Sequence, residues 1–390
     1  MRNRRSISPA DALELAWSYA ASRHFEGVDP YDALRSPLLA RGHRLLGRPF
    51  GIVATQALRR APFDIRPLLG ITPTANPKAL ALFLSAAARR GRRSDVRVLA
   101  DRVLACRSGG WEMPCWGYPF PWQARAFYLP AHTPTVVVTS FVVDGLLDAY
   151  ALLEEPSYLD AAIGACRFVQ DSLHRTTDST GTCLSYSPLD RSAVYNASVL
   201  GARQLVRVGA VARRPDLIAG AEPLVNYVLA RQQDDGSWAY GEAKFHQWID
   251  SFHTGFILGA LHEWANATGD GRSITAVRRG ARFYADKLFG PGGEPYYYVN
   301  RAYPFDVHSA AQALITLTQL RRLEQSFRGL ALKVGAFLID RYLCPDGHFR
   351  YQIRRSHSVS IPYMRWSQAW GVRGLAAMLD VTSATDRTSP

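Results

Sequence analysis

The segment FHQWIDSFHTGF (245–256) contains residue types that can transfer protons. If a helix begins near Trp248, Asp250 and His253 lie three residues apart on one helix face. A carboxylate in that position can orient an imidazole for acid–base chemistry. Asp250 is also an ordinary helix cap, and a histidine on a helix is also an ordinary core residue. The segment is therefore a catalytic candidate with a purely structural alternative.

A second pair occurs in RAYPFDVHSAAQAL (301–314). Asp306 stands where an N-cap belongs, and His308 and Gln312 are four residues apart and share a face. A cap and a hydrogen-bonded packing histidine explain the same pattern. Together, Asp250 and Asp306 could also serve as the acid and the water-activating group of a hydrolase.

The remaining candidates lie in polar, aromatic-rich segments that precede apolar helices. Tyrosine can act as a base, tryptophan can stack on the apolar face of a sugar ring, and arginine can pair with a carboxylate. We add Tyr195 and Tyr363 to the catalytic candidates; the substrate-binding candidates are His132, Trp116, Trp122, Asp190, Arg191, Asn196, Trp238, Trp248, Arg365, Trp366 and Gln368.

Motifs of other chemistries are absent from the sequence. There is no H-x-x-x-H or H-E-x-x-H pair and no Cys/His cluster, so we predict no metal site. Dinucleotide, P-loop and G-x-S-x-G nucleophile motifs are also missing, and we predict no cofactor. What remains is aromatic residues beside carboxylates, histidines, tyrosines and arginines.

The candidate residues fall in loops that recur along the chain. Five times a turn with Gly or Pro is followed by a tyrosine, a polar loop and a new apolar helix. The marker tyrosines Tyr118, Tyr186, Tyr240, Tyr298 and Tyr351 are 68, 54, 58 and 53 residues apart. A period near 55 residues fits one helical hairpin with a decorated loop.

The hydrophobic pattern supplies two helices for each marker. Amphipathic leading helices are predicted at 94–107, 156–173, 216–233, 273–288 and 325–343, and more apolar following helices at 134–153, 191–208, 250–267, 307–322 and 366–380. A sixth pair is predicted at 44–60 and 77–90, with the helix near 10–24 as an N-terminal addition.

Six such hairpins predict an all-α protein, an (α/α)6 toroid. In a closed ring every outer-to-inner connection emerges at one end, so the marker loops and the N-termini of the inner helices meet around one funnel. We predict a single domain over 1–390, with an N-terminal helix and lead-in at 1–43, six hairpins at 44–381 and a disordered tail at 382–390.

Composition limits the functions that fit this fold. The net charge is +13, and only four of the 46 basic residues are lysines. No basic run is joined to a nucleic-acid-binding module, so we predict no nucleic-acid partner. The sequence also predicts neither a signal peptide nor a membrane-spanning segment, and five scattered cysteines fit a reducing compartment. We expect a soluble, cytoplasmic protein.

Two motifs then resemble known families. RQQDDGSWAYG (231–241) is similar to the Q-x-x-x-G-x-W motif of squalene and hopene cyclases. RWSQAWGVRG (365–374) resembles the R-x-Q-A-W-G helix-start motif of unsaturated glucuronyl hydrolases, from which it departs by one inserted residue. The six-hairpin pattern resembles the toroids of these cyclases and of carbohydrate-active enzymes such as N-acylglucosamine 2-epimerases, polysaccharide lyases and glucuronyl C5-epimerases.

The resemblance implies action on an acidic, uronic-acid-containing oligosaccharide, polysaccharide or glycolipid. PYDALRSPLL and RPLLGITPTANPKALALFL further resemble an uncharacterised family of surface-polysaccharide proteins, which implies a role in biosynthesis and allows peripheral association with membrane-bound assembly machinery. Epimerisation or elimination and hydrolysis stay open as reactions. A non-catalytic glycan-binding scaffold and an isoprenoid-binding, cyclase-like toroid are the alternatives, and the D-x-D-D motif of such cyclases is absent.

Overall fold

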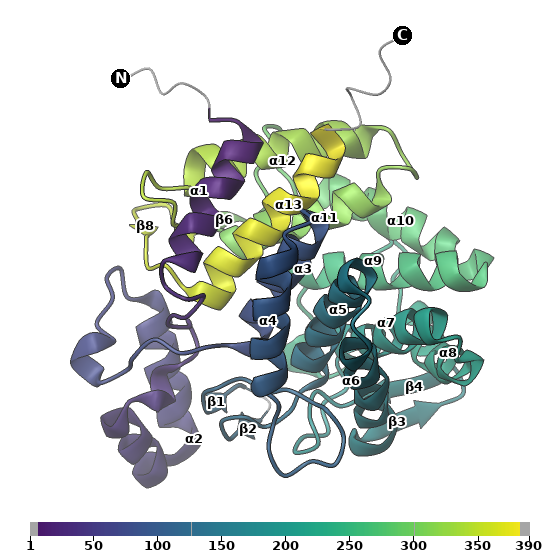
Figure 1. Cartoon of the computed structure of the whole chain (residues 1–390), viewed down its shortest axis with the longest axis horizontal. Coiled ribbons are helices and arrows are strands. Elements are labelled where there is room, and N and C mark those ends of the chain that lie inside the picture. The colour runs from purple at the N-terminus through teal and green to yellow at the C-terminus, as the bar shows by residue number, and fades with distance from the viewer. Residues whose placement is uncertain (1–6, 126, 300, 383–390) are drawn as a thin grey trace.

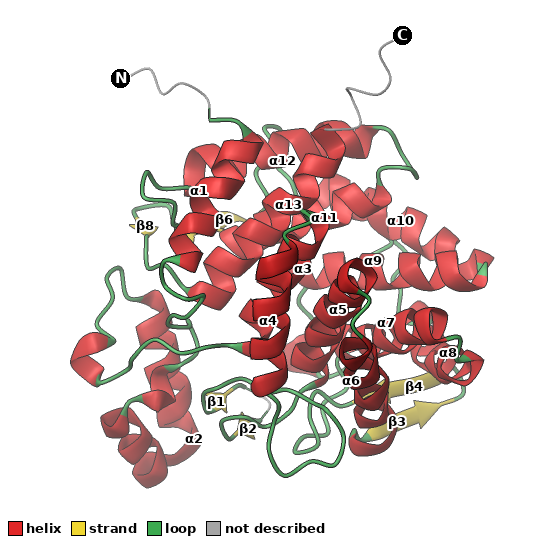
Figure 2. Cartoon of the chain, viewed as in Figure 1, coloured by secondary structure: helices red, strands yellow, loops and turns green. Residues whose placement is uncertain are grey.

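The computed structural model describes residues 7–125, 127–299 and 301–382. Helices dominate it, and the few strands are short and lie in the loops at one end of the helices (Figure 2). A large hydrophobic cluster extends from Ala12 to Met378, and a small separate one contains Ala33, Leu58 and Ile71. Figure 1 shows how the helices of the large cluster are arranged.

Six apolar helices form the inner ring. They are α3 (Pro77–Arg89), α5 (Val136–Leu153), α7 (Tyr195–Ala212), α9 (Ser251–Thr268), α11 (Val307–Leu320) and α13 (Trp370–Thr382). Each contacts the next, and α13 contacts α3, which closes the ring. These helices are apolar nearly all round, so they are buried on every side; in α3, for example, 11 of 13 residues are buried.

Six amphipathic helices surround the ring. They are α1 (Pro9–Ala21), α4 (Arg93–Ala105), α6 (Pro156–Arg167), α8 (Pro215–Leu229), α10 (Gly271–Lys287) and α12 (Ser326–Tyr342). Each packs one apolar face on the inner helices; α4 buries Val96, Leu99, Ala100 and Val103, spaced as one helical stripe. The observed architecture is the predicted (α/α)6 toroid.

The first hairpin differs from the prediction. The sixth outer position belongs to α1, which packs on α13 and α12, and not to the helix predicted at 44–60. That segment lies in α2 (Pro37–Arg60), which projects from the ring (Figure 1). The physical reason is apolar content: α1 buries six residues of 13, including Trp17, whereas α2 buries four of 24.

The marker loops carry short strands that the sequence analysis did not predict. β1 (Trp122–Gln123) pairs with β2 (Tyr128–Leu129), and β3 (Arg175–Asp178) with β4 (Gly181–Leu184). β5 (Tyr296–Tyr298), β6 (Arg301–Asp306), β7 (Gln352–Ile353) and β8 (Ser358–Val359) form one antiparallel sheet that joins the last two marker loops. Backbone bridges Val194–Gly241 and Asp250–Tyr298 tie neighbouring loops together. The loops thus form a continuous rim at one end of the ring.

Among the described residues, one helix is long and apolar enough to cross a membrane by length and composition alone. It is α5, and 72% of that stretch is buried inside the protein. Its apolar character is accounted for by its position in the inner ring. The predicted tail, apart from Thr382, lies outside the described residues.

Candidate active site

A cavity of about 370 Å³ opens at the rim formed by the marker loops. All six inner-helix positions contribute to its wall: Lys78 from α3, Val137 from α5, Asn196 from α7, His253 from α9, His308 from α11 and Trp366 from the turn before α13. The structure confirms that the loops and the starts of the inner helices meet around one funnel.

Asp250 and His253 form a dyad in this cavity. Asp250 caps α9 through a 3.0 Å hydrogen bond from the His253 backbone N–H, and its Oδ2 lies 2.6 Å from His253 Nδ1. Trp248 Nε1 donates to the same oxygen at 3.1 Å. Because an ionised carboxylate only accepts hydrogen bonds, Nδ1 is the donor of this pair, and in a neutral imidazole Nε2 would then carry the lone pair. Asp250 is therefore a helix cap that also contacts the His253 ring, and its catalytic role stays a prediction.

His308 lies beside this dyad in an apolar environment. Its ring stacks between Phe252 and Trp370, with centroids 4.3 and 4.2 Å away, and neither ring nitrogen has a hydrogen-bond partner in the described part of the chain. Phe252 also contacts His253, at 4.2 Å. Burial, and then the charge of Lys78, hold the pKa of His308 well below its usual value. Two imidazoles of different environment therefore flank one phenyl ring.

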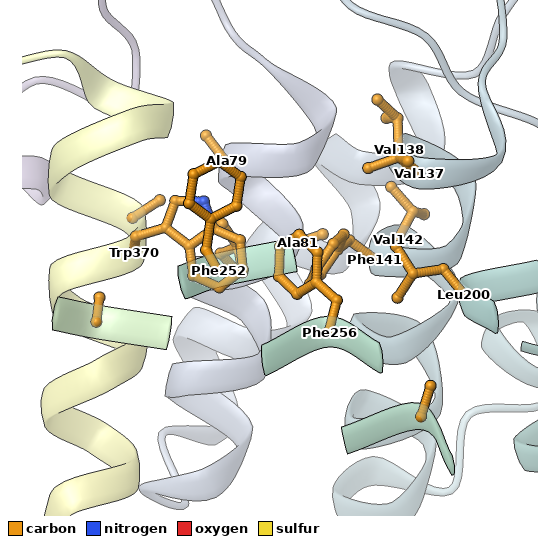
Figure 3. Close-up of a cluster of buried hydrophobic side chains, with 14 of the residues drawn as sticks. Ala79, Ala81, Val137, Val138, Phe141, Val142, Leu200, Phe252, Phe256 and Trp370 are labelled. Carbon is orange, nitrogen blue, oxygen red and sulfur yellow. The ribbon is translucent and has the colours of Figure 1, made fainter. Parts of the chain in front are cut away.

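Lys78 is the deepest cation of the site. Its Nζ lies 4.2 Å from the ring centroid of Phe141 and within 6 Å of those of Phe256 and Trp370. Figure 3 shows these three rings converging from α5, α9 and α13. Burial, followed by repulsion from Arg365, holds the pKa of Lys78 well below its usual value. No carboxylate of the described residues pairs with its ammonium group.

Arg59 brings a second cation to the cavity from α2. Its Nη1 donates to the Tyr31 hydroxyl at 2.9 Å, and its Nε has no partner among the described residues. Arg365 also lines the wall, but its fork is held by Asp29 at 2.6 and 2.7 Å. Its charge is thus matched inside the protein, whereas the described residues contain no carboxylate partner for Arg59 or Lys78.

Aromatic side chains form most of the remaining wall. Four of the five marker tyrosines line it, namely Tyr118, Tyr186, Tyr240 and Tyr298, and so do Trp122, Trp248 and Trp366. Tyr240 stacks on Trp248 with centroids 4.6 Å apart. Flat faces with hydroxyl and indole N–H groups at their edges suit a sugar ring, which has apolar faces and a polar perimeter. A funnel lined almost wholly by apolar groups, expected for an isoprenoid binder, is not observed.

Asp306 is not in the cavity, which corrects the predicted carboxylate pair. Its side chain is fully buried and accepts hydrogen bonds from the backbone N–H of His308 at 2.9 Å, from Trp366 Nε1 at 2.9 Å and from Gln352 Nε2 at 2.6 Å. Burial raises its pKa to about 6, although these hydrogen bonds oppose the shift. Asp306 therefore positions His308 and Trp366, and Asp250 is the acidic residue among the described groups of the wall.

Other candidates also hold the scaffold and do not line the cavity. Trp116 and Trp238 are buried and donate from Nε1 to the Val103 and Val228 carbonyls. Gln368 is buried and bonds both backbone groups of Phe349. The Q-x-x-x-G-x-W turn is a structural joint, because Gly236 has φ +92° and a Cβ there would lie 2.7 Å from a backbone oxygen of α10.

The last five candidates are placed as follows. Asp190 accepts bonds from Ser187 and Ser192 within its own loop. Tyr195 and Tyr363 are buried outside the wall, and His132 and Arg191 are exposed outside it. The sequence-predicted residues that the structure does bring together are Asp250, His253, His308, Trp122, Asn196, Trp248, Arg365 and Trp366.

Sequence reasoning missed Arg59, Lys78 and the tyrosines as site residues. In the sequence the tyrosines stand out only because they recur once in each predicted loop. Lys78 had a readable signal, since it is one of four lysines and stands in the first turn of an otherwise apolar helix. Arg59 has none, because all but four of the 46 basic residues are arginines and its segment carries no marker tyrosine. The described residues contain no group of three or more His, Cys, Asp or Glu side chains placed to hold a metal ion.

Comparison with known proteins supports the architecture. No family model and no curated protein matches the sequence. Solved structures do: a cellobiose 2-epimerase of Spirochaeta thermophila (TM-score 0.63, 13% identity, 80% of this chain and 87% of that one) and a family 76 glycoside hydrolase, an α-mannanase, of Bacteroides thetaiotaomicron (0.59, 13%, 80% and 88%). An unsaturated glucuronyl hydrolase specific for heparin matches at 0.57 and 10% identity, over 79% and 88%. At such identities the likeness establishes the shared toroid fold.

Proposed function

We propose that this protein is a carbohydrate-active enzyme that abstracts the proton next to the carboxylate of a uronic acid residue, as a glycan epimerase or lyase. The observation that carries the proposal is the pairing of two chemically different imidazoles with two unmatched cations, Lys78 and Arg59, in one aromatic cavity. The structural neighbours named above are a cellobiose 2-epimerase, an α-mannanase and an unsaturated glucuronyl hydrolase, which fits a sugar substrate on this fold.

Each of these residues has a separate proposed role in the reaction. His253, oriented by Asp250, takes the C5 proton on Nε2, and the electron pair of the broken C–H bond moves into the carboxylate. Lys78 and Arg59 stabilise the charge that develops there. His308, neutral at pH 7 because of its burial, can accept the C5 proton from the opposite face in the reverse reaction, and in the forward reaction the proton that reaches that face comes from solvent water. Return of a proton to that face gives the epimer, and loss of the C4 substituent from the same intermediate gives elimination.

Hydrolysis has weaker support from the geometry. A glycosidase of the usual kind needs two carboxyl groups at the scissile bond, and Asp306 lies outside the cavity with all its hydrogen bonds made inside the protein. A purely glycan-binding role would leave the Asp250–His253 geometry without a purpose other than capping.

The direct test is incubation with uronate-containing oligosaccharides in deuterated water. Deuterium at C5 with the chain length unchanged would show epimerisation, and new unsaturated ends would show elimination. New saturated reducing ends without C5 exchange would replace the proposal with hydrolysis. Binding without any reaction would replace it with the scaffold interpretation.

We further propose that the reaction belongs to cytoplasmic synthesis of a surface polysaccharide, which rests on the sequence resemblance. Deleting the gene should change the ratio of epimeric uronates, or the unsaturated ends, in the surface glycan. An unchanged glycan would remove the biosynthetic setting while leaving the chemistry to the deuterium experiment.

A further inference from the structure

The helix α2 and the turn that follows it carry an unusual apolar surface. Among the described residues, every large apolar side chain that is more than 60% exposed lies between positions 38 and 68. These side chains, called the α2 patch below, are Leu38, Leu45, Leu46, Val53, Phe63 and Leu68. Single exposed apolar residues are common on proteins, but such a concentration within one stretch of about 30 residues indicates a contact surface.

The charges around the α2 patch are all of one sign over a long stretch. Positions 33–63 contain six arginines and no acidic residue. Four of these arginines, Arg41, Arg44, Arg48 and Arg60, are exposed, and none has an ion-pair partner in the described part of the chain. Leu38, Arg41 and Leu45 share one helix face by their spacing. Apolar side chains interleaved with unpaired arginines match an anionic bilayer surface, where leucine enters the acyl boundary and arginine reaches the phosphates.

The α2 patch is fixed beside the mouth of the cavity. His43 on the same helix lies 3.1 Å from Gln123 of β1 and stacks on Tyr128 of β2. α2 is broken at Gly47, where the backbone is not helical, and the segment after this kink supplies Ile52, Gln56 and Arg59 to the cavity wall. A surface bound by this helix would therefore lie next to the substrate opening.

We propose that α2 docks the protein on anionic membranes through the α2 patch, with the cavity mouth held at the bilayer surface. The docking itself is independent of the chemistry proposed above. Its consequence for the substrate, that the cavity receives glycan still attached to lipid, rests on that proposed function.

Flotation of the full chain with lipid vesicles tests the docking. We expect binding to vesicles of equal parts phosphatidylcholine and phosphatidylglycerol, and little binding to phosphatidylcholine alone. The double variant L45E/L46E should bind at least about tenfold more weakly, because it removes inserted leucines and adds repelled charges. The matched control is V98E/V211E, which places two acids at exposed apolar positions on α4 and α7 and should bind like the wild type.

Three outcomes would overturn the proposal. They are absence of wild-type binding to the anionic vesicles, equal loss in both double variants, and a wild-type dimer in light scattering that L45E/L46E converts to monomer. The last would show that a second copy covers the patch. Once turnover has been demonstrated, L45E/L46E should keep activity on a soluble oligosaccharide and lose activity on the same glycan anchored in vesicles. Equal activity on both substrates would reject the lipid-linked substrate but not the docking.

Discussion

His253 is the residue on which the proposed chemistry depends most directly. We expect His253→Asn to lower the rate of C5 deuterium exchange about 10²–10⁴-fold, since proton transfer by a positioned side chain contributes that much. Substrate binding by calorimetry should change little, because Lys78 and Arg59 remain. His132→Asn, at an exposed position outside the cavity, is the control. A parallel loss of affinity and turnover would favour a binding role for the imidazole.

Lys78 makes a prediction about stability as well as binding. Its folded-state pKa is lowered, so between that pKa and the unfolded value near 10.5 the unfolded chain holds the extra proton. The free energy of unfolding should therefore rise with pH through this window. In Lys78→Met, which keeps the unbranched stem, the rise should be absent and the affinity for a uronate should fall. Chemical unfolding at several pH values measures the first effect; parallel pH profiles in the two proteins would contradict it.

These two side chains also show what a single sequence can and cannot reveal. His253 was predicted because Asp250 stands at cap spacing before it, which is a local relation. The unmatched charge of Lys78 depends on Arg365 holding Asp29, a pair separated by 336 positions. An ion pair between residues so far apart in the sequence cannot be predicted from local spacing. The sequence therefore points to Arg365, whose charge is matched, and not to Lys78.

Asp306 connects three elements at the start of α11. We expect Asp306→Ala to lower the free energy of unfolding by about 3 kcal/mol, combining a lost helix cap with buried donors on Gln352 and Trp366 left unpaired. Urea unfolding measures it. Because Asp306 accepts hydrogen bonds from the His308 backbone N–H and the Trp366 indole, the turnover of the variant should fall too, with no change in the pH at which exchange is half-maximal. Asp190→Ala is the control: it removes a carboxylate that accepts hydrogen bonds only within its own loop, so it should lower the free energy of unfolding by less.

The sequence predicts the helices of the ring, but it exchanges the positions of α1 and α2: α1, and not the helix at 44–60, occupies the sixth outer position. The ten ring helices from 94 to 380 were predicted to within a few residues because each repeats the same apolar period between marker loops. The segments of α1 and α2 contain no marker tyrosine that could decide between them. The deciding quantity was the width of the buried face, which for α1 includes Trp17 packed on Phe25 and Phe83. The short strands have too few residues to show a period.

In the molecule as a whole, the contact between α13 and α3 closes the ring, so no hairpin is a terminal one in the packing. Contacts follow one another around the ring, and α1 packs along α13 with the start of the one and the end of the other at the same end of the molecule (Figure 1). A cyclic arrangement is indifferent to where its backbone is cut, provided that the cut falls in an exposed turn. Joining the two chain ends by a flexible linker and opening the turn at Arg213–Arg214, between α7 and α8, should give a circular permutant with native helical content and one cooperative unfolding transition. An open superhelix of the same hairpins could not tolerate this rearrangement, since its two terminal repeats would have no common boundary to share.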